Sequence, residues 1–209
     1  MNELKKFDNS FRNKKIKLIA GVDEAGRGPL CGPVVAASVI FDKKIFHPQI
    51  NDSKKISEKT RNELFDWIIE NCSSYGIGIV DHKKIDEINI LQASLKAMKI
   101  AVQSLKHEPH LVLIDGNKSI QSKIPANTII KGDSKSFSIA AASILAKVTR
   151  DRMMTKLAEE YPGYGWERNK GYATREHVAA IKRLGITPHH RNTFLKNIIA
   201  EMQRELFIQ

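Results

Sequence analysis

The chain has 209 residues and a mass of 23.6 kDa, of which 42% are apolar and 27% are charged. This composition is that of an ordinary globular domain, and it excludes a collagen, a disordered tail and a disulfide scaffold. The formal net charge of +11 favours a polyanionic partner such as nucleic acid, although a generally basic proteome would give the same total.

The sequence carries no signal for a membrane or for export. No apolar run approaches the roughly 18–20 residues of a membrane-spanning helix, and residues 1–15 lack the apolar block of a secretory signal. The two cysteines, Cys31 and Cys72, are too few for a disulfide framework or a zinc site of their own. We therefore expect a cytoplasmic protein without membrane contact.

Apolar periodicity and turn residues predict alternating strands and helices. Strands are expected over residues 16–22, 34–41, 75–80, 110–114 and 128–130, and helices over 57–71, 91–105, 138–160, 174–184 and 192–207. The first two strands are close enough for a hairpin, so the prediction is an α/β fold with a mixed sheet flanked by helices.

This pattern divides the chain into three parts. Residues 1–15 form a basic N-terminal extension that either touches DNA or is disordered, and residues 16–160 form the sheet domain. Residues 161–209 form a helical C-terminal part resting on that domain, and its first segment, 161–173, has the character of a functional loop.

Four carboxylates stand at the ends of predicted strands. Asp23 and Glu24 follow the first strand, while Asp115 and Asp133 each close a later apolar run. Grouped carboxylates repel one another, and this cost must be offset by protons, basic partners or cations. Oxygen ligands without a nearby His or Cys favour Mg²⁺ or Mn²⁺, which suits phosphodiester hydrolysis. The alternative is that each carboxylate only caps a turn or a helix.

Aromatic and basic residues alternate in the 161–173 segment. Such rings stack on bases or sugars while cations hold phosphates, but the same loop could instead pack on its own domain. The residues concerned are Tyr161, Tyr164, Trp166, Arg168, Lys170 and Tyr172, with Arg27, Lys54, Lys55 and Lys147 as possible extensions of the basic surface. We expect surface or capping roles for His177, His189 and His190, and a packing role for Cys31.

An ordered set of motifs resembles bacterial ribonuclease HII, the type 2 ribonuclease H. The motifs are 21–29 (GVDEAGRGP), 52–55 (DSKK), 113–116 (LIDG), 131–133 (KGD) with 138–151 (SIAAASILAKVTRD), and 169–172 (NKGY). Ribonuclease HIII is a poorer match, because it carries an additional N-terminal domain and a Glu at the fourth acidic position, which here is Asp133.

The resemblance implies a ribonuclease H-like fold and cleavage of the RNA strand in RNA/DNA hybrids. It also implies cutting on the 5′ side of single ribonucleotides in duplex DNA, which leaves a 3′-hydroxyl and a 5′-phosphate. By the same resemblance, the ligands of Mn²⁺ or Mg²⁺ would be Asp23, Glu24, Asp115 and Asp133.

The resemblance also implies substrate contacts. The backbone of Gly26, Arg27 and Gly28 would read the ribose 2′-hydroxyl, Tyr172 would stack on the deoxyribose at the junction, and Ser53, Lys54 and Ser134 would hold phosphates. We expect a monomer, and the sequence does not tell whether a protein partner recruits the enzyme. Two alternatives stay open, namely a ribonuclease H-like nuclease acting on DNA and a hybrid-binding protein without catalysis.

Overall fold

The computed structural model describes residues 2–51, 53 and 56–207. Its strands are β1 (Ile19–Ala25), β2 (Val34–Ile40), β3 (Ser74–Val80), β4 (Leu111–Asp115) and β5 (Ala126–Ile129). Its α-helices are α1 (Glu3–Ser10), α2 (Glu58–Asn71), α3 (His82–Gln103), α4 (Phe137–Glu160), α5 (Trp166–Asn169), α6 (Arg175–Leu184) and α7 (Lys196–Phe207). Two 3₁₀ turns are η1 (Gly132–Ser134) and η2 (Asn192–Phe194).

The strands form one mixed sheet in the order β3-β2-β1-β4-β5, which confirms the predicted fold class. β2 is antiparallel to β1 and to β3, whereas β1, β4 and β5 run parallel. In this register Asp23 lies opposite Ala37, and Val22 lies beside Ile114. The residues that follow Val22 and Ile114 are Asp23 and Asp115, so both carboxylates lie at the same end of the sheet.

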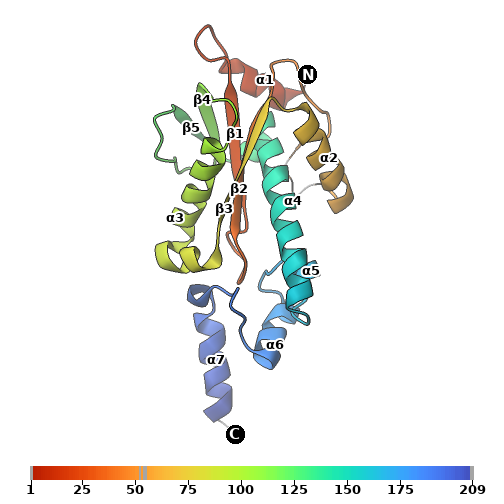
Figure 1. Cartoon of the computed structure of the whole chain (residues 1–209), viewed down its shortest axis with the longest axis vertical. Helices are drawn as coiled ribbons and strands as arrows, with labels where there is room; N and C mark the ends of the chain where they lie inside the picture. The colour runs from red at the N-terminus through yellow and green to blue at the C-terminus, as the bar shows by residue number, and fades with distance from the viewer. Residues whose placement is uncertain (1, 52, 54–55, 208–209) are drawn as a thin grey trace.

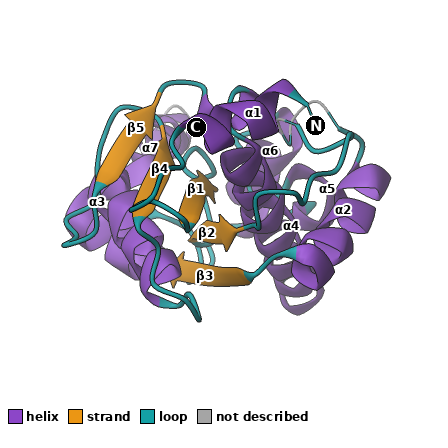
Figure 2. Ribbon diagram, turned by 90° about the horizontal axis from the view of Figure 1, so that it is seen from above, coloured by secondary structure: helices purple, strands orange, loops and turns teal. Residues whose placement is uncertain are grey.

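Helices cover both faces of the sheet, with α3 on one side and α4 and α2 on the other (Figure 1, Figure 2). Two glycines allow the helices to approach closely. A Cβ atom on Gly78 would lie 1.9 Å from the carbonyl oxygen of Ala97 in α3, and one on Gly21 would lie 2.1 Å from the backbone of Ser138 in α4. Larger residues at these positions would push the helices off the sheet.

The N-terminal extension contains α1, which packs against α4 through a buried carboxylate. Asp8 accepts hydrogen bonds from the Ser136 hydroxyl at 2.5 Å and from the Ser138 backbone N–H at 2.9 Å. Lys5 is also buried and donates to the carbonyl oxygen of Asp42 at 2.8 Å. Residues 3–10 are therefore an ordered part of the fold, which excludes the disordered alternative for this segment.

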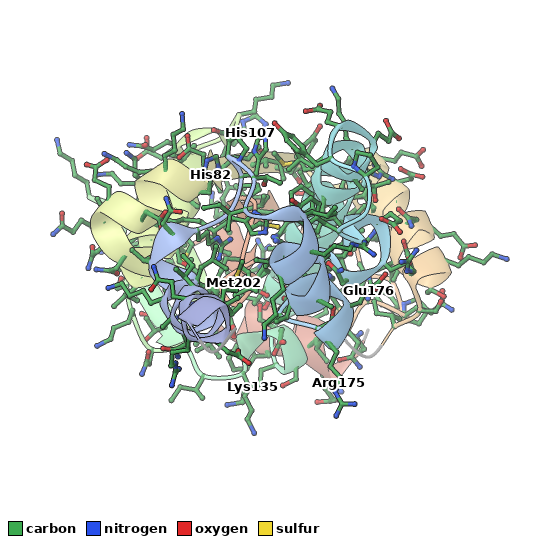
Figure 3. The ribbon with its side chains drawn as sticks, turned by 90° about the horizontal axis from the view of Figure 1, so that it is seen from below. His82, His107, Lys135, Arg175, Glu176 and Met202 are labelled. Carbon is green, nitrogen blue, oxygen red and sulfur yellow. The ribbon has the colours of Figure 1, made fainter. Side chains whose placement is uncertain are left out.

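The C-terminal part builds a separate apolar cluster at the lower end of the molecule. α6 and α7 lie next to each other there (Figure 3), and Lys182 of α6 pairs with Glu201 of α7 at 2.9 Å. Met202 of α7 packs on the cluster that contains Ala180 and Ile181 of α6. The C-terminal helices are thus held to each other by both apolar and ionic contacts.

Several predicted boundaries are wrong. β1 spans Ile19–Ala25 and not 16–22, so Asp23 and Glu24 lie within its last three residues. β5 is Ala126–Ile129 instead of 128–130, and the predicted helix 192–207 is η2 followed by α7. α3 spans His82–Gln103 with a kink at the non-helical Asn89 (φ 65°), so the helix predicted from residue 91 is its second part, and the part before the kink was not predicted. Among the helices of the described residues, none combines the length and apolar character that crossing a bilayer requires.

Candidate active site

A pocket of about 430 Å³ opens at the end of β1 and β4. Its floor is acidic, and one wall is formed by the glycine-rich segment that follows β1. Residues at its lining include Asp23, Glu24, Asp115, Ser53, Lys147 and Tyr172, together with the backbone of 26–28. The structure therefore brings three of the four predicted carboxylates and most of the predicted substrate contacts into one cavity.

Asp23 is the most buried of these carboxylates, with 6% of its surface exposed. It accepts a hydrogen bond from the Glu24 backbone N–H at 2.7 Å, and the Ser143 hydroxyl is a further polar neighbour that lowers its pKa. Burial, followed by the charges of Glu24 and Asp115, raises the pKa of Asp23 well above its usual value. The carboxylate is therefore costly to ionise without a cation.

Glu24 shares this environment but has a basic neighbour. Its side chain is 8% exposed and pairs with the Arg27 guanidinium at 3.1 Å. Burial raises the pKa of Glu24, Arg27 opposes this rise, and Asp115 adds to it. Half of the Arg27 side chain is exposed to solvent, so this single ion pair offsets little of the repulsion among the carboxylates.

The 3₁₀ turn η1 joins the backbone next to the fourth carboxylate to the third. The Gly132 backbone N–H donates to Asp115 Oδ1 at 2.6 Å, and Asp133 is the next residue in this turn. Asp133 is half-buried and does not cap α4, because Ser136 is the N-cap of that helix. The capping alternative for Asp133 at α4 is therefore excluded.

Two predicted phosphate contacts make hydrogen bonds within the protein. Ser53 is buried, and its Oγ lies 2.7 Å from Oγ of Ser143, whose hydroxyl lowers the pKa of Asp23. Ser134 donates to the carbonyl oxygen of Lys131 at 2.9 Å. Ser53 therefore supports the Asp23 carboxylate through Ser143. Lys54, together with Lys55, lies outside the described residues.

The glycine-rich segment and Tyr172 lie next to each other at the pocket. Gly26 has φ +97°, a conformation that L side chains rarely adopt. A Cβ on Gly28 would lie 3.7 Å from the Tyr172 ring, and that ring is 43% exposed. The wall thus presents bare backbone next to an exposed aromatic face.

The other aromatic residues of the 161–173 segment are structural. Trp166 is fully buried and Tyr164 is 5% exposed, so predicting them as stacking surfaces for nucleic acid was wrong. Their rings stack on each other at a centroid distance of 5.1 Å inside the C-terminal cluster. An alternation of aromatic and basic residues does not reveal which rings point inward.

Two histidines are also buried, contrary to the predicted surface roles. Trp166 Nε1 donates to His177 Nε2 at 2.9 Å, and this atom lies 3.2 Å from His190 Nε2. His177 Nδ1 lies 2.9 Å from the Tyr172 carbonyl oxygen. Cys31 is buried beside both rings, which confirms its packing role. These hydrogen bonds make the group a polar core beneath Tyr172.

Comparison with known proteins identifies the family. The sequence profile of ribonuclease HII matches residues 20–198. The chain belongs to the ribonuclease HII family. It is 54% identical to the ribonuclease HII of Acetivibrio thermocellus over 92% of this chain and 75% of the relative. It is 51% identical to that of Caldanaerobacter subterraneus over 95% and 83% of the two chains. The protein is therefore a ribonuclease H endoribonuclease.

Solved structures show the same fold. The ribonuclease H2 of Pyrococcus horikoshii superposes with a TM-score of 0.74 and 28% identity, over 89% of this chain and 99% of the other. Bst-RNase HIII in complex with Mn²⁺ superposes with a TM-score of 0.68 and 19% identity, over 91% and 72% of the two chains. The ribonuclease H-like fold of ribonuclease HII is thus shared with distant relatives.

Proposed function

We propose that this ribonuclease HII is a metal-dependent endonuclease with two related substrates. It hydrolyses the RNA strand of RNA/DNA hybrids, and it cuts 5′ of a single ribonucleotide embedded in duplex DNA, leaving a 3′-hydroxyl and a 5′-phosphate. The observation that supports this proposal is the shared pocket, where an acidic floor meets a wall of glycine backbone and an exposed tyrosine ring.

The acidic floor fits divalent cations. Asp23, Glu24, Asp115 and Asp133 would hold Mg²⁺ or Mn²⁺, because the donor set contains only carboxylate oxygens. Burial and nearby carboxylates raise the pKa values of Asp23 and Glu24. A bound cation would stabilise the ionised forms of both side chains. When bound, such ions activate a water molecule and stabilise the leaving oxygen of a phosphodiester. The Mn²⁺ complex of Bst-RNase HIII, which shares the fold, agrees with this assignment.

The pocket wall fits recognition of a ribonucleotide. Gly26, Arg27 and Gly28 bring main-chain donors close to a bound sugar, and the 2′-hydroxyl is the group that distinguishes RNA from DNA there. The exposed ring of Tyr172 lies beside Gly28 and would stack on the deoxyribose at the junction.

The basic side chains around the pocket would hold the phosphate backbone. Lys147 lines the pocket and pairs with Asp151 at 2.8 Å, so it lies within reach of a phosphate near the carboxylates. Lys54 and Ser134 are further proposed contacts, and Ser53 would act from the pocket lining. Residues 161–209 would complete the groove around the duplex.

A cleavage assay on duplex DNA with one ribonucleotide tests the function. The reaction is run with Mg²⁺, with Mn²⁺ and with EDTA, the cut is mapped to the nucleotide, and an RNA/DNA hybrid and an all-DNA duplex serve as comparisons. We expect a metal-dependent cut 5′ of the ribonucleotide and no cut in the all-DNA duplex. Cleavage of the all-DNA duplex would support the DNA nuclease, and binding without cleavage would support the hybrid-binding protein.

We further propose that the enzyme works in the cytoplasm as a monomer. The small size of the chain and the pocket formed within one copy support this assignment. Light scattering coupled to gel filtration should give a mass near 23.6 kDa, and a doubled mass would contradict it.

A further inference from the structure

Two buried arginines lie beneath the glycine-rich wall of the pocket. Arg191, which precedes η2, is fully buried, and Arg150 of α4 is 1% exposed. Neither side chain lines the pocket. Both guanidinium groups instead bind the backbone of the segment between β1 and β2, which neither sequence motif nor periodicity indicated.

Arg191 fixes the direction of two peptide groups in this segment. Its Nη2 donates to the Gly26 carbonyl oxygen at 2.7 Å, and its Nη1 donates to that of Arg27 at 3.1 Å. Further bonds reach the carbonyl of Gly32, at 3.0 Å from Nε. In a planar trans peptide the N–H of the next residue points opposite to the carbonyl. The N–H groups of Arg27 and Gly28 therefore point away from Arg191.

These N–H groups are available for a ligand. Arg27 and Gly28 line the pocket, whereas Arg191 does not. None of the backbone hydrogen bonds formed between loops of the described residues uses the N–H of Arg27 or Gly28. Unpartnered backbone donors at a pocket wall are the groups that a sugar hydroxyl or a phosphate oxygen would accept from.

Arg150 connects the same segment to the turn that carries Tyr172. Its Nε donates to the Pro33 carbonyl oxygen at 3.0 Å, and its Nη1 donates to that of Lys170 at 3.0 Å. Its guanidinium carbon lies 5.9 Å from the centroid of the Tyr172 ring. A backbone hydrogen bond from the Leu30 N–H to the Gly171 carbonyl oxygen, at 2.8 Å, joins the same two segments. The glycine-rich segment and the turn that carries Tyr172 are thus held next to each other.

Stability alone does not account for this arrangement. Within the described residues, neither Arg150 nor Arg191 forms a salt bridge with a carboxylate. Burial lowers the pKa of both groups, that of Arg191 to about 9, and the charge of Arg150 contributes to the shift at Arg191. Asp151 and Asp86 act on these cations only from a distance and form no salt bridge with them. Burying two neighbouring cations without a directly paired carboxylate is costly, and such costs concentrate at functional sites.

We propose that Arg150 and Arg191 are positioning residues for ribonucleotide recognition. By holding the carbonyl groups of the loop inward, they present the N–H groups of Arg27 and Gly28 to the ribose and keep Tyr172 next to them. They thereby set the preference for a ribonucleotide over a deoxyribonucleotide. This inference rests on the proposed function, since it assigns the recognition step of the same site.

The test is the discrimination ratio, defined as the Kd for an all-DNA duplex divided by the Kd for the same duplex with one ribonucleotide. It is measured in EDTA, so that no cleavage occurs, for the native protein and for Arg191→Lys, Arg191→Gln and Arg150→Lys. Lysine keeps the charge but loses the planar fork, and glutamine keeps a planar donor without the charge. Ile68→Ala, at a buried position of α2 that forms no hydrogen bond to the loop, serves as the destabilised control.

We expect the ratio to fall about tenfold in both Arg191 variants, the equivalent of losing one or two well-oriented hydrogen bonds. Lysine should not rescue it, and Ile68→Ala should keep the native ratio despite a lower Tm. Folded Arg191 variants with the native ratio would overturn the inference. Should these variants fail to fold, Arg150→Lys decides the question by the same ratio. A native protein without discrimination would instead refute the proposed function.

Discussion

Replacing Gly26 by alanine should damage the fold and the activity together, whereas the same change at Gly28 should spare the fold. A Cβ on Gly26 would lie 2.1 Å from Nε and 2.4 Å from Cδ of Arg150, at a φ of +97°. A Cβ on Gly28 would meet only the Tyr172 ring, at 3.7 Å, which is ordinary contact. The two glycines are thus a matched pair, separated in sequence by Arg27 alone.

The expected loss of folding free energy in Gly26→Ala is the sum of two separate costs. Holding a non-glycine residue in this backbone conformation costs about 1–3 kcal/mol. Displacing the buried Arg150 side chain costs about 1–3 kcal/mol more, as in other overpacked cores. The sum of about 2–6 kcal/mol lowers the Tm of a chain of this size by about 4–24 °C. Gly28→Ala should leave the Tm within about 2 °C of the native value.

The rate of cleavage by Gly26→Ala should fall as well. Moving Arg150 shifts the loop carbonyls that it binds, and a displacement of about 1 Å near reacting groups can cost about 100-fold in rate. We therefore expect cleavage by Gly26→Ala to fall by about this factor at a temperature where the variant is folded. Differential scanning fluorimetry and single-turnover cleavage measure both quantities. An unchanged Tm for Gly26→Ala would refute the close contact between Gly26 and Arg150.

Three further predictions concern the carboxylates, the tyrosine and the histidine core. Asp23→Asn should abolish cleavage and preserve duplex binding, and full activity would exclude Asp23 as a metal ligand. The same variant should raise the Tm of the metal-free protein at pH 8, because it removes a buried charge that Glu24 and Asp115 repel. Tyr172→Ala should reduce cutting at a single ribonucleotide more than cutting of a long hybrid, and equal losses in rate assays would contradict a junction role. His190 has a pKa lowered to about 4, chiefly by burial, so the unfolded chain takes up a proton between pH 6.5 and 4 that the folded protein does not. Stability should fall as the pH drops through this window, and His190→Asn should flatten that part of a Tm–pH curve.

The parts of the molecule that follow simple periodicity could be predicted from the sequence. The buried run 34–40 and the long helix of small residues after Ser136 fall where apolar patterning places them. Asp23, Glu24 and Asp115 could be placed in one site because parallel strands end at a common edge of the sheet. Predicting that these carboxylates share one site required only the approximate positions of the strands, so the small boundary error in β1 did not affect this prediction.

Polar residues with distant partners could not be predicted in this way. Lys5 and Asp8 are buried in a helix that is mostly polar, and they belong to the core through partners more than 30 residues away. The same holds for Arg191, whose acceptors lie near the other end of the chain. Patterns of hydrophobicity describe which residues avoid water, but they do not show which charged groups find enough hydrogen bonds inside the protein.

The bond between Arg191 and Gly26 spans 165 positions of the chain, and this has a consequence for biosynthesis. The last of the four acidic residues, Asp133, leaves the ribosome well before Arg191 does. Residues 26–33 therefore leave the ribosome long before the side chain that binds their carbonyl groups is synthesised. This loop can reach its final arrangement only after the C-terminal part of the chain has folded onto it.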